Sequence, residues 1–224
     1  MGIPSVKLFK ILTEMEDGKF DAAIALLDKL IKKDTKQAKL YNLKATCLLK
    51  IGRNEEALEL CEQIIAHMES SAMDWNNKGL ALQGLERRNE AKDAFEHALS
   101  LEKDHFFAIY NLGNLFFDTD PAQAREWYEK ALSIKPNHPL TLLNLGYLCA
   151  EACEYSRAEE YYTKALENRE RYAAAAFYRG DLAERLGDAP TAVKWYEQTL
   201  EWDSDFKEAD ERLSNIMVPL DEKE

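Results

Sequence analysis

Alanine recurs with a period of 34 residues along almost the whole chain, and this repetition constrains the fold more than any other feature. The six positions are spaced by 34, 34, 33, 34 and 34 residues and are Ala23, Ala57, Ala91, Ala124, Ala158 and Ala192. Leu, Cys, Phe or Tyr stands four positions after each alanine, and Ile or Leu stands eight positions after it. A fixed period of this length is typical of a chain that stacks one small structural unit many times. The sequence therefore predicts a repeat array.

Each unit has the apolar spacing of two helices. In residues 139–172 the apolar positions follow the i, i+3, i+4 rule on both sides of a short polar break. Two helices of about 13 residues joined by a tight turn fill one period. Gly18, Gly52 and Gly187 mark the break in other units, where they suit a left-handed helix end. In the 33-residue unit Asp120 and Pro121 begin the second helix, so the missing residue lies in a turn.

The period, the two-helix unit and the small residues together resemble the tetratricopeptide repeat. One good copy of its pattern contains Ile109, Leu112, Gly113, Phe116, Ala124, Tyr128, Ala131, Leu132 and Pro136. Counted from the alanines, the units are 4–37, 38–71, 72–105, 106–138, 139–172 and 173–206, and a capping helix follows at 207–218. The first unit departs most from the pattern, with Lys10 and Ile11 where Leu and Gly are expected. The resemblance implies an all-α, right-handed superhelical solenoid of about six hairpins that occupies residues 1–224 as a single array.

Composition excludes several classes of partner. The net charge of −12 argues against nucleic acid, whose phosphates require clustered Lys and Arg. No apolar run reaches 18 residues, so no membrane partner is expected. The first twelve residues lack the features of a signal peptide, and the four cysteines lie in apolar helical patterns, which suits reduced thiols. We therefore expect a cytoplasmic protein.

No motif points to catalysis. The four histidines lie in different units without the spacing of a metal site, and the Cys149–Cys153 pair has no second Cys or His pair beside it. Phosphate-binding and nucleophile motifs are also missing from the sequence. We expect a protein that is not an enzyme and needs no metal or cofactor.

The resemblance places function on a concave groove whose wall is formed by the first helix of each unit. Helical geometry directs positions 2, 5, 6, 9, 12 and 13 of each unit inward, including Phe107 and Leu140 at position 2. The candidate binding residues, called the groove set below, are Asn76, Asn77, Tyr110, Asn111, Asn114, Phe117, Asn144, Tyr147 and Tyr178. Within the set, three asparagines at position 6 (Asn77, Asn111, Asn144) are expected to form a wet row of amides that pairs with the backbone of a bound segment. The predicted function is a non-catalytic protein-interaction module that binds a peptide or protein segment.

Three alternatives remain open. The position-6 asparagines also suit packing between units. The chain could instead form a homo-oligomeric scaffold, or serve as a regulatory subunit of a larger complex. One subclass is disfavoured: members that grip a C-terminal carboxylate use Lys and Arg where this chain has Tyr110, Ala174 and Tyr178.

Overall fold

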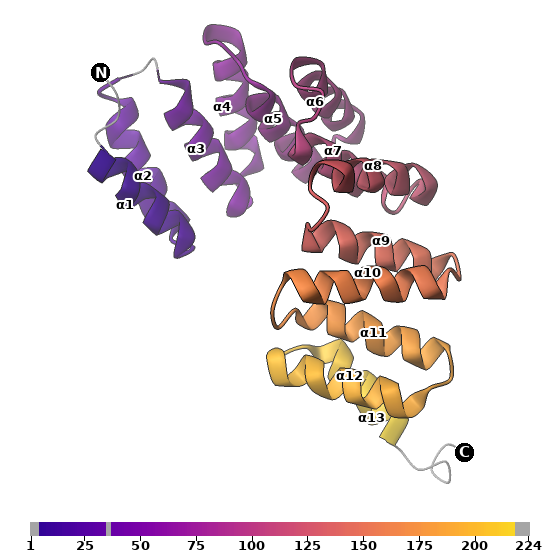
Figure 1. The fold of residues 1–224 in the computed structure, drawn as a ribbon. Helices are drawn as coiled ribbons and strands as arrows, with labels where there is room; N and C mark the ends of the chain where they lie inside the picture. The colour runs from indigo at the N-terminus through magenta and orange to yellow at the C-terminus, as the bar shows by residue number, and fades with distance from the viewer. Residues whose placement is uncertain (1–4, 35–36, 218–224) are drawn as a thin grey trace. The chain divides into compact units, whose positions relative to one another are not determined.

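Helices account for all the regular secondary structure in the described residues, 5–34 and 37–217 of a computed structural model (Figure 1). They are α1 (Ser5–Glu16), α2 (Phe20–Ile31), α3 (Ala38–Lys50), α4 (Asn54–His67), α5 (Ala72–Gly84), α6 (Arg88–Leu101), α7 (Phe106–Phe116), α8 (Pro121–Ile134), α9 (Pro139–Glu151), α10 (Tyr155–Asn168), α11 (Ala173–Arg185), α12 (Ala189–Trp202) and α13 (Lys207–Met217). Each predicted unit contains two of these helices, and α13 matches the predicted capping helix. Residues 4, 35, 36 and 218 of the expected units lie outside the described part of the chain.

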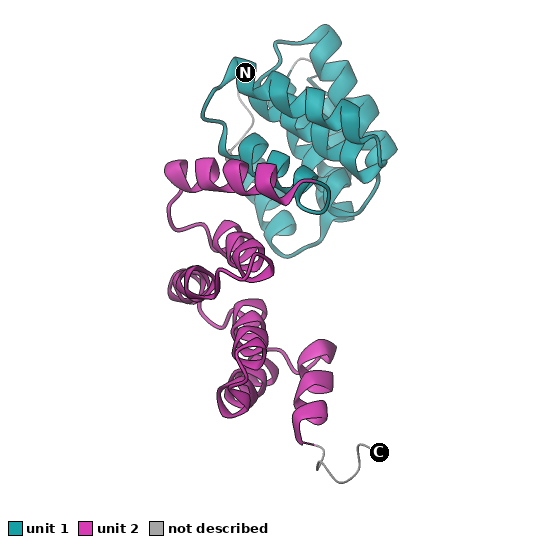
Figure 2. Ribbon diagram, turned by 90° about the vertical axis from the view of Figure 1, so that its right-hand side faces the viewer, with its two compact units in different colours: residues 1–119 teal, residues 120–224 magenta. Residues whose placement is uncertain are grey.

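The chain divides into two compact units, residues 1–119 and 120–224 (Figure 2). Helices α1 to α7 belong to the first unit and α8 to α13 to the second. Within the units the helices of a hairpin pack on each other, as α5 does on α6, α9 on α10 and α11 on α12. The predicted helical hairpins are therefore confirmed, while the single continuous array over 1–224 stays a prediction.

In the hairpins α5–α6, α9–α10 and α11–α12, an aromatic ring of the second helix packs against a glycine of the first helix. A Cβ atom added to Gly146 would lie 2.4 Å from Cε1 of Tyr162, and one on Gly180 would lie 2.6 Å from Cε1 of Tyr196. The two rings are 1% and 0% exposed, so they have no room to withdraw. The periodic alanine of α10, Ala158, is fully buried in the same apolar cluster as Tyr162. Small residues are required here because any side chain on the first helix would displace the ring of the second.

Among the described residues, five of the six turns inside hairpins contain a residue with a left-handed backbone, and the turn between α7 and α8 does not. Gly18, Gly52 and Gly187 have φ of +73°, +75° and +77°, which confirms their predicted role. Glu86 and Cys153 adopt the same conformation in their turns, with φ of 61° and 58°. The sequence did not indicate these two positions, since neither residue type is favoured there.

All four cysteines are free thiols. Cys47, Cys61 and Cys149 are buried, and Cys153 is exposed. Burial raises the pKa of the Cys47 thiol to about 11 and that of Cys61 to about 12. Buried, protonated thiols of this kind act as apolar packing groups.

The glycine contact predicts a stability change. Gly146→Ala should lower the free energy of unfolding by roughly 1–3 kcal/mol, because the new methyl group overpacks the Tyr162 ring. The matched control is Gly84→Ala, whose Cβ would meet only the amide end of the Asn54 side chain. Urea denaturation should show a clear loss for the first variant and little loss for the control. Equal stability of both variants would contradict the assigned packing.

Thiol exposure predicts selective labelling. A maleimide added to the native protein near neutral pH should modify Cys153 and leave the three buried thiols unmodified, while all four should react in denaturant. Mass spectrometry of the intact chain measures the number of labels, and Cys153→Ser should remove the native signal. Rapid labelling of a second thiol in the folded protein would show that the core is open.

Candidate binding surfaces

The groove set lies on the first helices of four hairpins. Helix α5 carries Asn76 and Asn77. Helix α7 carries Tyr110, Asn111 and Asn114, and Phe117 follows its last residue. These six residues belong to the first compact unit. The other three lie on α9 and α11 in the second unit.

Three of the amides are buried between helices. Asn76, Asn77 and Asn111 are 2%, 3% and 7% exposed. The Nδ2 of Asn111 donates to the Oδ1 of Asn76 at 2.9 Å, which joins α7 to α5. Nδ2 of Asn77 lies 3.5 Å from Oδ1 of Asn42, which relates α5 to α3 in the same way. In both pairs, position 6 of one repeat meets position 5 of the repeat before it.

The expectation that the position-6 amides are wet is therefore wrong for Asn77 and Asn111. Consecutive first helices pack closely, so these side chains point toward the preceding first helix. Their amides form hydrogen bonds with that helix in place of hydrogen bonds with water. A buried amide with a partner contributes to helix association, whereas one without a partner would cost free energy. The packing alternative raised by the sequence is the better description of these residues.

A polar network that sequence reasoning missed extends this contact. Nδ2 of Asn42 donates to Oδ1 of Asp74 at 2.8 Å. Oδ2 of Asp74 accepts from the backbone N and the Oγ of Ser71, at 2.8 and 2.7 Å, which forms a capping box at the start of α5. The Ser-x-x-Asp spacing of 71–74 is a sequence signal that could have indicated the cap.

Asn144 has a different role in the second unit. It is half-buried, and its Nδ2 donates to the hydroxyl oxygen of Tyr128 in α8 at 3.0 Å. Tyr128 is fully buried, so its hydroxyl requires such a partner. This amide therefore serves the packing of α9 against α8, the second helix of the preceding hairpin.

Aromatic side chains in the second unit form a connected group. The rings of Tyr147 on α9 and Tyr178 on α11 meet edge to face, with centroids 5.5 Å apart. Tyr178 also stacks on Tyr162 at 5.8 Å. Both Tyr147 and Tyr178 are half-buried, and burial raises the pKa of the Tyr178 hydroxyl. Leu140, at the start of α9, is 41% exposed.

The first unit carries similar apolar surface on α7. Phe107 is 44% exposed, and its ring packs edge-on against Phe106 with centroids 5.4 Å apart. The ring of Tyr110 stacks on the ring of Phe106, with centroids 6.2 Å apart. Tyr110, Asn114 and Phe117 are half-buried. The first helices thus present aromatic groups that neighbouring rings hold in place.

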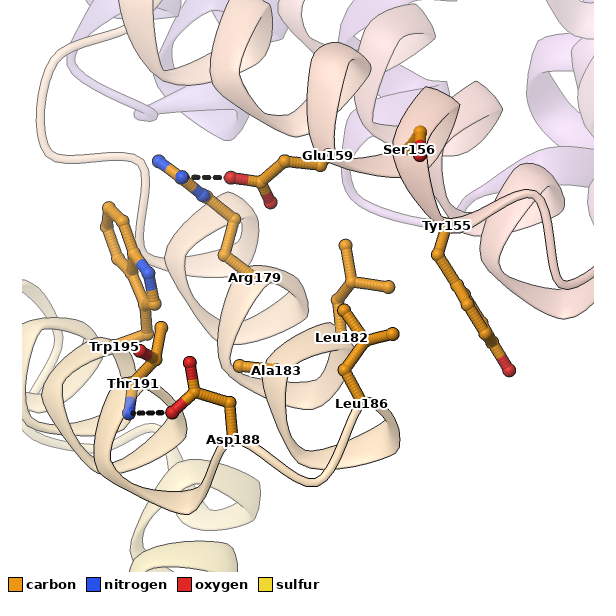
Figure 3. Close-up of a pocket in the computed structure, with 10 residues that line it drawn as sticks. All are labelled: Tyr155, Ser156, Glu159, Arg179, Leu182, Ala183, Leu186, Asp188, Thr191 and Trp195. Atoms are coloured by element: carbon orange, nitrogen blue, oxygen red, sulfur yellow. Dashed lines mark hydrogen bonds and ion pairs between the residues drawn. The ribbon is translucent and has the colours of Figure 1, made fainter.

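A separate pocket of about 460 Å³ lies among α10, α11 and α12 (Figure 3). The Arg179 guanidinium forms an ion pair with Glu159 and stacks over the Trp195 ring, with its central carbon 4.1 Å from the ring centroid. Leu182 and Leu186 are apolar lining residues of the pocket, and Leu186 is 60% exposed. The sequence assigned no role to this pocket, because its residues come from three helices and share no motif.

Within the described residues, no group of three or more His, Cys, Asp or Glu side chains could hold a metal ion. No helix in the same part of the chain is long and apolar enough to cross a membrane.

Four family models, each described as a tetratricopeptide repeat, match residues 14–73, 75–105, 105–171 and 143–205. Together they extend over most of the chain, including the boundary between the two compact units. The chain belongs to the tetratricopeptide repeat family. The all-α repeats of a tetratricopeptide solenoid, expected from the sequence, are therefore the fold of each compact unit, and the family places the chain among protein-interaction modules.

Solved structures of other tetratricopeptide repeat proteins share the fold. The pilF protein of Pseudomonas aeruginosa is 23% identical with a TM-score of 0.76, and the match covers 94% of this chain and 96% of that one. YrrB, described as having an unusual peptide-binding site, is 20% identical with a TM-score of 0.62, over 84% and 97% of the two chains. A chain of the APC/C hetero-tetramer Cut9–Hcn1 is 15% identical with a TM-score of 0.83, over 94% of this chain and 42% of that one. At these identities the likeness concerns the fold.

The amide contact predicts a coupled loss of stability. Asn111→Ala should cost about 1–3 kcal/mol, because it leaves the buried amide of Asn76 without its donor. Asn76→Ala should cost a similar amount, and the double variant should cost less than the sum of the two. Urea denaturation of the four proteins measures the coupling. Strictly additive losses would mean that the two amides do not act as a pair.

Proposed function

We propose that this tetratricopeptide repeat protein is a non-catalytic interaction module that binds a segment of a partner protein along its first helices. The observation that carries the proposal is the exposed apolar surface at position 2, where Phe107 is 44% exposed and Leu140 is 41% exposed. Water-exposed aromatic and aliphatic groups on a rigid surface are typical of a binding site.

The groove set divides into two roles in this proposal. Asn76, Asn77 and Asn111 hold consecutive first helices in register and do not touch the partner. In the first compact unit Tyr110 and Phe117 contact the partner beside Phe107, with Asn114 as a polar neighbour. In the second compact unit Tyr147 and Tyr178 contact it beside Leu140, with Asn144 as a polar neighbour. Tyrosine suits such a role because it buries a large ring at a low cost in side-chain entropy and can still form a hydrogen bond through its hydroxyl.

The charge and the chemistry of the chain limit the kinds of partner that it is expected to bind. A net charge of −12 favours a segment whose apolar residues are flanked by basic ones, and it disfavours nucleic acid. Neither a metal nor a cofactor has a part in the proposal. The four free thiols support the proposed cytoplasmic location.

The test compares the groove with the pocket of Figure 3. Peptides that bind the wild-type protein would be selected from a random display library, and their affinities measured for Tyr147→Ala and for the control Trp195→Ala. We expect at least a tenfold loss for Tyr147→Ala and less than about a twofold change for the control. Circular dichroism and thermal melts would establish that both variants are folded.

Two results would overturn the proposal. If Trp195→Ala abolishes binding while Tyr147→Ala does not, the pocket among α10, α11 and α12 is the site. If light scattering shows an oligomer that Tyr147→Ala dissociates, the surface holds a second copy of the chain, and the scaffold alternative replaces the module.

A further inference from the structure

The charge of the chain is strongly uneven. The first 50 residues contain ten lysines and six acidic residues, and the other 174 contain 19 basic and 35 acidic residues. The beginning of the chain therefore carries a net +4 within a protein of net −12. Such an asymmetry gives the first repeats an electrostatic preference for acidic groups.

The lysines gather around an apolar pocket between α1 and α2. The pocket has a volume of about 280 Å³, and its apolar part is formed by Ile11, Leu26 and Leu30. Its remaining lining residues are all lysines: Lys7, Lys10, Lys29 and Lys33. Two of them lie on α1, one lies in the last turn of α2 and one follows that helix.

None of these four lysines forms an ion pair within the described part of the chain, although other lysines do. Lys44 pairs with Asp28 at 2.6 Å and Lys164 with Glu160 at 2.6 Å. Four positive charges around one small pocket repel each other, and an acidic partner would relieve that repulsion.

Helix α1 also carries exposed apolar groups outside the pocket. Val6 and Phe9, one turn apart, are 79% and 73% exposed, and neither lines the pocket. The pocket itself has an apolar lining bordered by lysines, which suits an amphipathic anion better than it suits water.

We propose that the pocket between α1 and α2 docks an acidic amphipathic helix of a partner protein. Apolar side chains of that helix would fill the space over Ile11, Leu26 and Leu30, and carboxylates on both sides of its apolar stripe would pair with the lysines. Lys7 and Lys10 are three residues apart, and Lys29 and Lys33 are four apart, which matches carboxylates spaced by one helical turn. The site shares no residue with the groove set, so it is a second docking surface.

The test uses two designed helical peptides of roughly 18 residues, long enough to form a helix on binding. One has leucines at i, i+3, i+4, i+7 with glutamates elsewhere, and the other has glutamines in place of the glutamates. Fluorescence anisotropy should show binding of the glutamate peptide, weaker at high salt, and little binding of the glutamine peptide.

Matched variants locate the site on the chain. Lys10→Glu/Lys29→Glu reverses one lysine on each helix and should weaken binding of the glutamate peptide by about tenfold or more. The control, Lys39→Glu/Lys50→Glu, makes the same change in net charge on α3 and should stay within about twofold of wild type. If the first pair disturbs folding, as judged by circular dichroism, Lys10→Gln/Lys29→Gln tests the same contact with a milder change.

Three outcomes would overturn the proposal. Equal losses in both variants would show that the attraction is a long-range effect of net charge. Equal affinity for both peptides would remove the role of the lysines. Binding to vesicles of anionic lipid together with no binding of the glutamate peptide would assign the surface to a membrane.

Discussion

The contact between a first-helix glycine and a second-helix aromatic ring is the interaction on which the hairpins α5–α6, α9–α10 and α11–α12 depend. At Gly146 and Gly180 the ring occupies the space of a missing side chain, so the helix axes approach closely and the ring is removed from water. Burial of an aromatic side chain contributes roughly 1.5–3 kcal/mol, and the fit with the glycine determines the register of the two helices. That register also determines which residues of each helix point away from the hairpin.

Two kinds of first-helix residue result. Positions that meet the preceding first helix carry amides, and the bond between Asn111 and Asn76 shows that their polar groups are satisfied inside the protein. Other positions carry the exposed Phe107 and Leu140 and the half-buried tyrosines, of which Tyr147 and Tyr178 contact each other. In this account the amides keep the surface rigid and the aromatic groups bind, because a rigid surface loses little entropy when a partner arrives.

The fold could be predicted from the sequence to a large extent. A residue pattern that is weak evidence in one unit becomes strong evidence when it recurs in six units with the same period. Glycine and alanine spacing predicted the hairpins because a steric requirement leaves few residue types to choose from. The turn at Glu86 was not predicted, since its left-handed conformation is imposed by the helices on either side.

The burial of Asn77 and Asn111 was missed for a related reason. Helical geometry within one unit gives the direction of a side chain, but the distance to the next unit decides whether water reaches it. The lysine-rimmed pocket appears only when α1 and α2 are side by side, although Lys10 already departed from the repeat pattern.

Hydrogen–deuterium exchange with and without a selected groove-binding peptide tests the central claim most directly. The claim is that the first helices are the binding surface and that the second helices support them. Bound peptide should slow exchange in α7, α9 and α11 and leave α8, α10 and α12 close to their unbound rates. Protection confined to α10 and α12 would contradict the account, because it would place the partner on the opposite helices.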